Sequence, residues 1–325
     1  MKQVKLKSNL TLVLVLALLG SMVLPVYAAA SADSTDETVI MPIAENQECS
    51  TYQNVKVQGT LRATDPDGGV LTYEIVEMPK KGTVVLDEKD SAAFVYTPNQ
   101  GKSGKDAFSF CVKDEKGNIS APATVKVEIL KDKKNVHYGD MENNAAHVAS
   151  IRLAEEGVFT GRQVGTEFFF EPDAAVSRSE FLTMAMTAAG VDTLETVNVT
   201  GFSDDASIPT WAKAYASEAL NTGIISGKME NDRVVFSADA PITYNEAAAI
   251  LNRLMAVTDA DTATFAGNNV PAWAAQSVTN LASVNVMGQV ADCGAALTRA
   301  DAAELLCSAM DLMEEKNDSP FAWLR

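Results

Sequence analysis

The sequence predicts a multidomain fold in which an antiparallel β-sandwich precedes an α-helical domain built from repeats. Between about residues 39 and 130, apolar side chains alternate with a period of two, as in half-buried strands. A charged linker at residues 131–135 ends this pattern, and helical periodicity replaces it. One sequence unit then occurs three times, in the same internal order, up to about residue 313.

The first 28 residues have the pattern of a cleaved signal peptide. Lys2, Lys5 and Lys7 precede an apolar stretch from Leu10 to Leu24, and a small-x-small pattern ends at Ala28. The apolar stretch is shorter than the roughly 20 residues that a membrane span requires. We therefore expect an exported protein with residues 1–28 removed.

The charge of the chain argues against two classes of partner. The formal net charge is −17, and removing residues 1–28 with their three lysines makes it −20. Nucleic acid and anionic lipid headgroups are both bound by basic surfaces. We expect no nucleic-acid partner and, after signal cleavage, no membrane span.

Residues 39–130 have the strand and turn signals of a sandwich. The alternating sets are Val55/Val57, Tyr73/Ile75, Phe94/Tyr96, Phe108/Phe110/Val112 and Val125/Val127/Ile129. Turn sequences rich in Pro, Asp, Asn and Gly separate them, at residues 65–69, 79–82, 98–101 and 116–118. Short strands at this spacing, without helical stretches, are typical of an antiparallel β-sandwich.

Four pieces of this segment carry a family resemblance. They are Ala63-Thr64-Asp65-Pro66-Asp67-Gly68-Gly69-Val70-Leu71-Thr72-Tyr73, Lys81-Gly82-Thr83-Val84, Phe94-Val95-Tyr96-Thr97-Pro98 and Gly104-Lys105-Asp106-Ala107-Phe108-Ser109-Phe110. With them, the segment resembles the bacterial cadherin-like and Ig-like repeats of surface proteins, which implies a spacer or adhesive module. Cadherin-like relatives often bind Ca²⁺, which implies Asp65, Asp67, Asp106 and Asp114 as candidate ligands. The alternative is that these aspartates only make turns, because a Ca²⁺ site needs six or more oxygens.

The four cysteines allow two disulfides, Cys49–Cys111 and Cys293–Cys307, in an oxidising compartment. Strand alternation puts Cys111 on the face opposite to Phe110, so we do not expect a bridge across the core of the sandwich. Free thiols remain an equal alternative.

The repeated unit occupies residues 136–194, 198–259 and 262–313, and a tail follows at 314–325. The middle copy has Phe202-Ser203-Asp204, Pro209-Thr210-Trp211-Ala212, Gly223-Ile224-Ile225-Ser226-Gly227, Val235-Phe236 and Ile242-Thr243-Tyr244-Asn245-Glu246. The first has Tyr138-Gly139-Asp140, Gly157-Val158-Phe159-Thr160-Gly161, Phe170-Glu171-Pro172 and Val176-Ser177-Arg178-Ser179-Glu180. The third has Phe265, Pro271-Ala272-Trp273-Ala274, Val284-Asn285-Val286-Met287-Gly288 and Leu297-Thr298-Arg299-Ala300-Asp301.

Much of this unit has a structural reason. Trp211 and Trp273 follow a proline in the first turn of a predicted helix, where a tryptophan is more often core than ligand platform. Capping-box spacing is found at Ser177/Glu180, Thr243/Glu246 and Thr298/Asp301. Arg178 and Arg299 have no such reason, because the helix dipole opposes a cation at the first helical position. A guanidinium beside a helix N-terminus suits a carboxylate or phosphate ligand instead.

The order Phe-x-Asp, Trp-Ala, Gly-Ile-Ile-x-Gly, Phe-x-Pro and Thr-Arg-Ala-Glu over residues 136–313 resembles that of S-layer homology (SLH) domains. The resemblance implies a three-repeat pseudo-trimer in which one helix from each repeat builds a central three-helix bundle. It also implies grooves between repeats that bind a secondary cell-wall polysaccharide, often pyruvylated, through Arg178 and Arg299. The other implied ligand-binding residues are Ser177, Glu180, Thr298, Asp301, Trp211, Trp273, Gly161, Gly227 and Gly288.

Two copies depart from the family pattern. Tyr244 stands in place of the arginine in the second copy, so we expect its groove to be inactive or to stack a sugar ring. The third copy has no Asp after Phe265 and lacks most of the Gly-x-Phe-x-Pro segment. We therefore expect at most two binding grooves, with a single groove as the alternative.

The sequence predicts a non-catalytic protein without a cofactor other than the candidate Ca²⁺. It contains no nucleophile elbow or phosphate loop, and His137 and His147 lack metal-ligand spacing. We expect secretion to a bacterial cell wall or surface layer and non-covalent anchoring through the repeats. In the alternatives, the sandwich binds carbohydrate or another ligand, with Tyr52 as a candidate platform, or self-associates with Ca²⁺.

Overall fold

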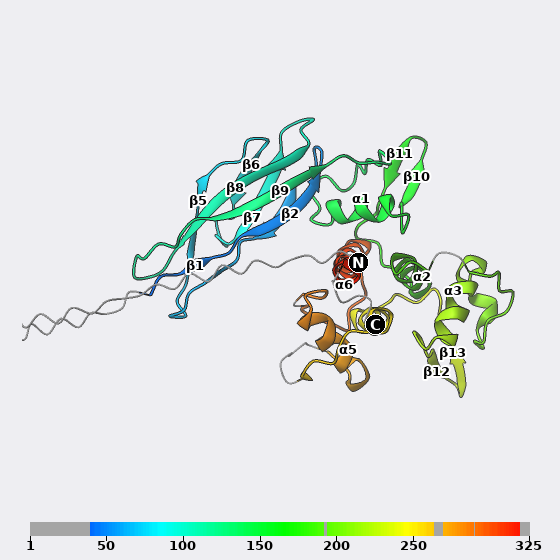
Figure 1. The fold of residues 1–325 in the computed structure, drawn as a ribbon. Helices are drawn as coiled ribbons and strands as arrows, with labels where there is room; N and C mark the ends of the chain where they lie inside the picture. The colour runs from blue at the N-terminus through cyan, green and yellow to red at the C-terminus, as the bar shows by residue number, and fades with distance from the viewer. Residues whose placement is uncertain (1–39, 192–193, 263–268, 289, 319–325) are drawn as a thin grey trace, which may run out of the picture. The chain divides into compact units, whose positions relative to one another are not determined.

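The computed structural model describes residues 40–191, 194–262, 269–288 and 290–318. A β-sandwich and a helical part follow one another along the chain (Figure 1). The predicted signal peptide at residues 1–28 lies outside the described residues. Among the helices that are described, none combines the length and the apolar character of a membrane span.

Nine strands of the described residues form the sandwich. They are β1 (Ile43–Ala44), β2 (Gln47–Tyr52), β3 (Val57–Thr60), β4 (Ala63–Thr64), β5 (Thr72–Glu77), β6 (Gly82–Leu86), β7 (Ala93–Pro98), β8 (Gly104–Lys113) and β9 (Ala123–Leu130). One sheet has the order β2-β9-β8-β5 and the other has the order β3-β7-β6, while β1 pairs with β4. The five predicted segments fall on β3, β5, β7, β8 and β9, with Val55 just before β3, whereas the alternating sets did not include β1, β2, β4 and β6.

The alternating apolar side chains fill the space between the two sheets. Phe94 of β7 and Phe108 of β8 meet edge to face, with ring centroids 5.3 Å apart. Tyr96, Phe110 and Val112 are fully buried beside them. The core face that alternation predicts is thus confirmed.

The sandwich is mixed rather than purely antiparallel, so the predicted strand arrangement was wrong at one edge. β2 runs parallel to β9, whereas β8 is antiparallel to both β9 and β5. A parallel pair needs a long crossover connection, and the rest of the sandwich, which lies between these two strands in the sequence, supplies it. Alternation reports which face of a strand is buried but not the direction in which the strand runs.

All four cysteines are free thiols, so neither predicted disulfide forms in this structure. β9 lies between the strands that carry Cys49 and Cys111. Two strand spacings of about 4.8 Å separate these strands, which exceeds the Cα separation of about 7 Å that a disulfide tolerates. The thiol of Cys307 contacts the carbonyl oxygen of Ala149 at 3.6 Å rather than Cys293.

The helical part contains six α-helices in the described residues. They are α1 (His147–Glu155), α2 (Arg178–Ala188), α3 (Thr210–Asn221), α4 (Tyr244–Met255), α5 (Ala272–Ser283) and α6 (Arg299–Asp318). The connections hold two hairpins, β10 (Arg162–Val164) with β11 (Glu167–Phe169) and β12 (Lys228–Glu230) with β13 (Arg233–Val235), and a 3-10 helix η1 (Asp205–Ser207). α2, α4 and α6 contact one another, and Figure 1 views α2 and α6 nearly along their axes.

Main-chain hydrogen bonds join the starts of α2, α4 and α6 in a ring. The Val176 amide donates to the Leu297 carbonyl at 3.0 Å, and the Leu297 amide donates to the Ile242 carbonyl at 2.9 Å. The Ile242 amide donates back to the Val176 carbonyl at 2.9 Å. Each residue lies two positions before its helix and is buried. The ring therefore fixes the three helix starts against one another.

Each of these helices begins where the capping boxes predict. The Ser177 hydroxyl accepts from the Glu180 amide at 3.2 Å, and the Glu180 carboxylate accepts from the Ser177 amide at 2.8 Å. The same reciprocal bonds are made by the pairs Thr243/Glu246 and Thr298/Asp301. Because two otherwise orphan amides are satisfied at each start, the predicted helix boundaries are confirmed.

The third copy differs from the other two in its connection. Its described residues form no hairpin between α5 and α6, as the missing Gly-x-Phe-x-Pro segment predicts. Phe265 lies outside the described residues. The helix α6 continues to Asp318, so residues 314–318 belong to this helix rather than to a tail, and 319–325 lie outside the described residues.

Candidate functional site: an open groove and a closed groove

In each of the first two repeats, the motif aspartate accepts hydrogen bonds from the dipeptide that directly follows the hairpin. The Asp140 carboxylate accepts the amides of Phe170-Glu171 at 3.0 and 2.7 Å. The Asp204 carboxylate accepts those of Phe236-Ser237, both at 2.8 Å. These bonds fix the position of the first carbonyl of each dipeptide, that of Phe170 or Phe236, beside a motif arginine. This is the structural role of the motif aspartate in Tyr138-Gly139-Asp140 and Phe202-Ser203-Asp204.

The motif arginine of a neighbouring repeat reaches each of these carbonyls. Arg178 donates from Nε to the Phe236 carbonyl at 2.9 Å, and Arg299 donates from Nη1 to the Phe170 carbonyl at 3.2 Å. Each guanidinium also lies over an aromatic ring, at 5.5 Å from the centroid of Phe236 and 5.4 Å from that of Phe159. Tertiary contacts therefore explain the arginines at the first helical position, which capping does not.

Arg178 lines a cavity of about 490 Å³, which we call the open groove. Its lining residues are Arg178, Ile224, Ile225, Ser226, Gly227, Lys228, Met229, Glu246, Ala249, Ile250, Arg253 and Trp273. They come from all three repeats, because Arg178 belongs to the first, the loop before β12 to the second and Trp273 to the third. A groove of this composition exists only when the three repeats are assembled.

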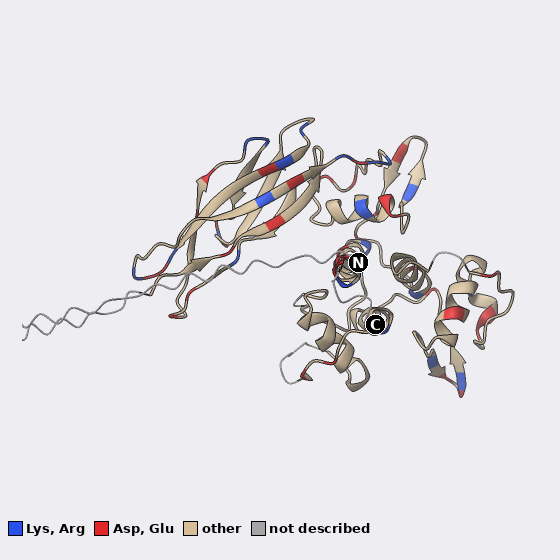
Figure 2. Cartoon of the chain, in the orientation of Figure 1, with Lys and Arg blue, Asp and Glu red and all other residues tan. Residues whose placement is uncertain are grey.

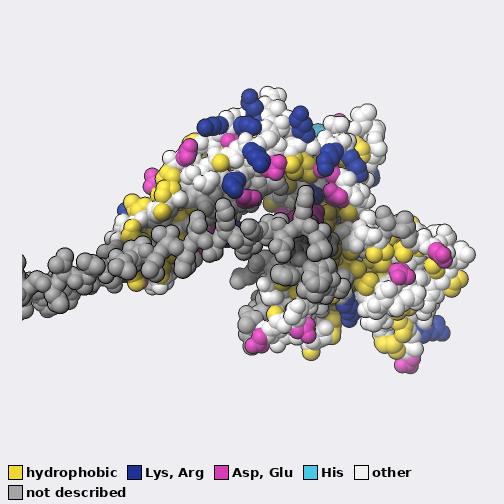
Figure 3. Space-filling view, viewed as in Figure 1, with side chains coloured by type: hydrophobic (Ala, Val, Ile, Leu, Met, Phe, Trp, Pro, Cys, Tyr) yellow, Lys and Arg dark blue, Asp and Glu magenta, His cyan; other side chains and the backbone are white. Residues whose placement is uncertain are grey.

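The open groove is cationic in an acidic part of the chain. Residues 136–325 contain ten Lys and Arg against 26 Asp and Glu, whereas residues 39–135 contain 13 against 14. Figure 2 shows both signs interspersed on the sandwich, and in Figure 3 Lys and Arg side chains are more numerous there than on the helical part. Three of the ten cations, Arg178, Lys228 and Arg253, line the open groove, with Glu246 as its single acid. The groove therefore has a local positive charge.

Glu246 holds the cations of the open groove in place. Its Oε1 atom lies 3.0 Å from Arg178 Nη1 and 2.7 Å from Lys228 Nζ. Burial alone raises the pKa of a carboxyl, but the hydrogen bond from Lys228 and the charge of Arg178 hold the pKa of Glu246 below its ordinary value. The Arg178 side chain is only 7% exposed, whereas Lys228 is 40% exposed. Lys228 is thus the more accessible cation, and Arg178 is fixed behind it.

The two tryptophans of the repeat are exposed, contrary to the interpretation of such a position as core. Trp211 is 53% and Trp273 is 59% exposed. The alanines that follow them, Ala212 and Ala274, take the buried positions instead. Trp273 lines the open groove, and its exposed indole has the flat apolar face that can stack on a sugar ring.

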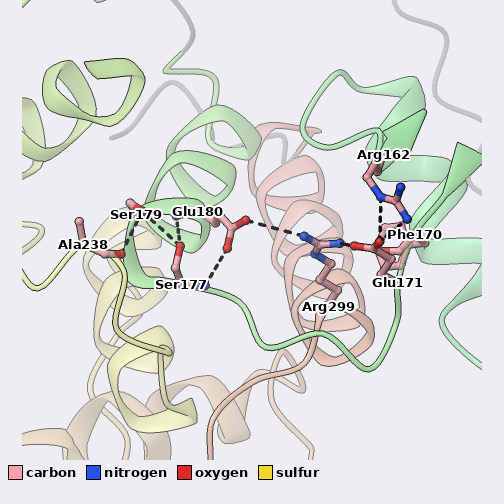
Figure 4. Close-up of polar contacts among 8 residues, drawn as sticks. All are labelled: Arg162, Phe170, Glu171, Ser177, Ser179, Glu180, Ala238 and Arg299. Atoms are coloured by element: carbon pink, nitrogen blue, oxygen red, sulfur yellow. Dashed lines mark hydrogen bonds and ion pairs between the residues drawn. The ribbon is translucent and has the colours of Figure 1, made fainter. Parts of the chain in front are cut away.

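The second arginine lies in a site that is already filled, which we call the closed groove. Its lining residues are Leu153, Phe159, Phe170, Val176, Glu180, Met184, Arg299, Ala302 and Ala303, and its volume is about 10 Å³. Arg299 Nη1 lies 2.5 Å from Glu171, and Nη2 lies 3.9 Å from Glu180. Figure 4 shows Arg299 between these two carboxylates. The expectation that Arg299 is available to an external anion is therefore not met in this structure.

The position that Tyr244 occupies at the start of α4 is acidic. The Tyr244 hydroxyl is hydrogen-bonded to Asp301, and burial followed by this contact raises the pKa of Tyr244. The carboxylate of Glu304 lies nearby, and burial raises its pKa as well. With a phenol in place of the guanidinium and two carboxyl groups beside it, this position has no means to attract an anion.

The helix starts do not provide free amides for a ligand. In α2, the Arg178 amide donates to the Ala240 carbonyl at 2.9 Å and the Ser179 amide donates to the Ala238 carbonyl at 3.0 Å. The first two amides of α4 and α6 make the matching bonds to a neighbouring repeat. Ser177, Glu180, Thr298 and Asp301 are likewise engaged in their capping boxes. The predicted anion site at a helix N-terminus is therefore occupied by the fold itself, and any anion binding depends on side chains.

Two of the three predicted loop glycines are required by close approach. Gly161 and Gly227 have φ values of +68° and +74°. A Cβ atom would lie 2.4 Å from the Phe169 carbonyl oxygen at the first and 2.8 Å from the Phe202 ring at the second. Gly288 has no heavy atom within 4 Å of such a Cβ, so its predicted role is not supported.

The four aspartates proposed as calcium ligands all have partners within the sandwich. Asp65, Asp106 and Asp114 each accept backbone amides, and Asp67 pairs with the ammonium of Lys116 at 2.5 Å. Across the part of the chain that the structure describes, there is no group of three or more His, Cys, Asp or Glu side chains suited to a metal. Each carboxylate has a partner in this structure, which fits the alternative that these aspartates serve turns, and the calcium site stays a prediction.

Sequence reasoning missed four residues of these grooves. Lys228 and Arg253 are cations of the open groove, Glu246 was assigned only to a capping box, and Glu171 was not singled out. A signal for Lys228 was available, because it directly follows the loop glycine of the middle copy. Tyr52, the candidate platform of the sandwich, is only 3% exposed and offers no surface.

Comparison with known proteins identifies the sandwich. Residues 40–128 match the family model of the bacterial Ig domain, so this segment is a bacterial Ig-like domain. Over 133 residues the chain is 30% identical to exoglucanase XynX of Acetivibrio thermocellus, and over 132 residues it is 27% identical to the surface-layer 125 kDa protein of Lysinibacillus sphaericus. Both alignments cover 40% of this chain but only 12% and 11% of the relatives, so the chain matches about a tenth of their length.

Among solved structures, the matches are limited in extent. An endo-fucoidan hydrolase of glycoside hydrolase family 107 matches 30% of this chain and 14% of its own, with 16% identity and a TM-score of 0.24. The sialic acid binding region of a Streptococcus sanguinis adhesin matches 31% of this chain and 32% of its own, with 11% identity and a TM-score of 0.24.

Proposed function

We propose that the helical part anchors the chain non-covalently to a bacterial cell wall in the manner of SLH repeats. In this proposal, the acidic group of a wall polysaccharide, such as a pyruvyl ketal, binds in the open groove. The cationic lining of this groove in an otherwise acidic part of the chain is the observation that carries the proposal. The identity of 27% to a surface-layer protein over part of the chain supports the same location, at the cell surface.

Three residues of the open groove have different roles in the proposed binding. Lys228 is the accessible partner for a ligand carboxylate, and Arg178 provides a second, fixed positive charge behind it. Trp273 supplies a face on which a sugar ring stacks. Since the chain as a whole repels an anionic polymer, binding depends on these local contacts rather than on long-range attraction.

The bacterial Ig-like domain is proposed to act as a spacer or adhesion module, and the chain is proposed to be non-catalytic. The carboxylates of the sandwich that were candidates for metal binding are engaged in turns and in one ion pair. Its charges are nearly balanced, which suits a neutral spacer between the wall and the medium.

Sedimentation with purified wall sacculi tests the proposal. The Lys228→Ala variant should lose about tenfold or more in affinity, the scale of one hydrogen bond to a charged group, and Trp273→Ala should also bind less because it removes the stacking face. Trp211→Ala is the matched control, because Trp211 is equally exposed but does not line the open groove. Sacculi treated with mild acid to remove pyruvyl ketals should bind the wild type less. Equal sedimentation of all variants, with and without ketals, would refute the proposed function.

A further inference from the structure

The closed groove and the open groove are built from the same set of hydrogen bonds, so their residues can be compared position by position. In both, an aspartate holds a dipeptide and a motif arginine donates to its first carbonyl. The second residue of each dipeptide, Glu171 or Ser237, has a left-handed backbone with φ of +56° or +58°. Glu171 and Ser237 therefore occupy equivalent positions, and one carries a carboxylate where the other carries a hydroxyl.

The carboxylate of Glu171 lies between two arginines. Its Oε1 accepts from Arg162 Nε at 2.9 Å and lies 2.8 Å from Arg162 Nη2. Its Oε2 meets Arg299 Nη1, and Figure 4 shows the Glu171 carboxylate in contact with both guanidinium groups. The hydrogen bonds from Arg162 and Arg299 lower the pKa of Glu171, so it is ionised at neutral pH. Glu171 thus presents to Arg299 the same chemical group that an acidic sugar would present.

We propose that Glu171 is a built-in competitor that keeps acidic ligands out of the closed groove and limits the chain to one binding groove. This inference rests on the proposed function, because it concerns the same class of ligand. Glu171→Ser, which copies the second repeat, should release Arg162 and Arg299 and create a second groove of the open type.

Tethering explains why a free ligand does not displace Glu171. A group held on the same chain acts at an effective concentration on the order of millimolar or higher. The ligand must also replace two charge-assisted contacts, from Arg162 and from Arg299, at once. The void of about 10 Å³ leaves no room for a sugar acid while Glu171 stays in place, against about 490 Å³ in the open groove.

Counting the bound ligands tests the inference. Isothermal titration would use a methyl hexopyranoside with a 4,6-linked pyruvyl ketal, and its methyl ester as the uncharged control. The wild type should bind one equivalent and Glu171→Ser should bind two. Adding Arg299→Met to Glu171→Ser should return the number to one, and adding Lys228→Ala should remove the other site. A Glu171→Ser protein that keeps its wild-type helical circular dichroism and still binds one equivalent would overturn the inference.

A second measurement separates failure of the inference from failure of the proposed function. If no protein binds the ketal sugar, the proposed function fails, but the blocking role of Glu171 can still be measured. Labelling with p-hydroxyphenylglyoxal, followed by peptide mass mapping, reports how accessible the Arg299 guanidinium is. Arg299 should be labelled severalfold faster in Glu171→Ser than in the wild type, with Arg233, exposed on β13, as internal reference. Unchanged labelling of Arg299 would show that Glu171 does not block it.

Discussion

Replacing Arg178 with methionine should destabilise the helical part far more than replacing an exposed arginine. The change removes the hydrogen bond to the Phe236 carbonyl, the contact with its ring and the ion pair with Glu246. The side chains of Arg178 and Glu246 are 7% and 12% exposed, so the pair is buried. Removing one partner of a buried pair costs about 3–5 kcal/mol. Because Lys228 still contacts Glu246, we expect the lower end, about 3 kcal/mol.

Urea unfolding followed by tryptophan fluorescence measures this loss. Trp211 and Trp273 lie on α3 and α5, and residues 40–130 contain no tryptophan, so the signal of these two residues reports on the helical part and not on the sandwich. Such a separation matters because a multidomain chain does not unfold in a single two-state transition. Arg233→Met is the matched control, since Arg233 is exposed on β13 and its replacement should change the free energy of unfolding by less than about 0.5 kcal/mol.

The result that refutes this reasoning is a similar midpoint and slope for both variants. A difference below about 1 kcal/mol would mean that the Arg178–Glu246 pair behaves like a surface ion pair. A double-mutant cycle with Glu246→Met isolates the pair itself, because the remaining contacts of each side chain cancel.

Two further predictions concern the loops and the acid limit of stability. Gly227→Ala should lower the free energy of unfolding by about 2 kcal/mol or more, because the φ of Gly227 is +74° and the new Cβ would meet the Phe202 ring. Gly288→Ala should be tolerated, because its Cβ would meet no heavy atom within 4 Å. The urea midpoints of the two variants test this. The hydrogen bond from Lys213, followed by that from the Thr200 amide, lowers the pKa of Asp205 to about 2. A depressed pKa means that this stabilisation is complete above about pH 4, the unfolded value, and is lost as the pH falls towards 2. Asp205→Asn should therefore flatten the pH dependence of stability in that window, and an unchanged acid slope would contradict the assignment.

The sequence allowed the elements of the fold to be predicted because local chemistry sets them. Alternation at Phe108 and Phe110 identified a buried strand face, and Ser177 with Glu180 identified a helix start. The parallel pairing of β2 with β9 was missed, because strand direction depends on the path of the whole domain. No local pattern contains that information.

The grooves were predicted less well, because what a charged side chain contacts is decided by other repeats. Arg178 and Arg299 have the same local sequence context and both pair with a carboxylate, yet Arg178 lines a cavity of about 490 Å³ and Arg299 one of about 10 Å³. The difference lies at Glu171 and Ser237. Each of them directly follows the phenylalanine of its motif, and each belongs to a different repeat from the arginine at the same groove. Exposure of Trp273 was missed for a similar reason, since the small Ala274 takes the core position of that turn.

The ring of hydrogen bonds at Val176, Ile242 and Leu297 joins the three repeats through the main chain, without using the side chains of the grooves. Its bonds run from amide to carbonyl, so they do not depend on a polar side chain, and a proline at any of the three positions would remove the donor of one link. The third copy lacks the hairpin in its described residues and still takes part in the ring. Exposed groove side chains such as Lys228 and Trp273 can therefore be exchanged without removing a link of the ring, whereas the buried Arg178 also joins two repeats. The ring is thus a backbone scaffold common to the three repeats, on which the exposed side chains of each groove vary separately.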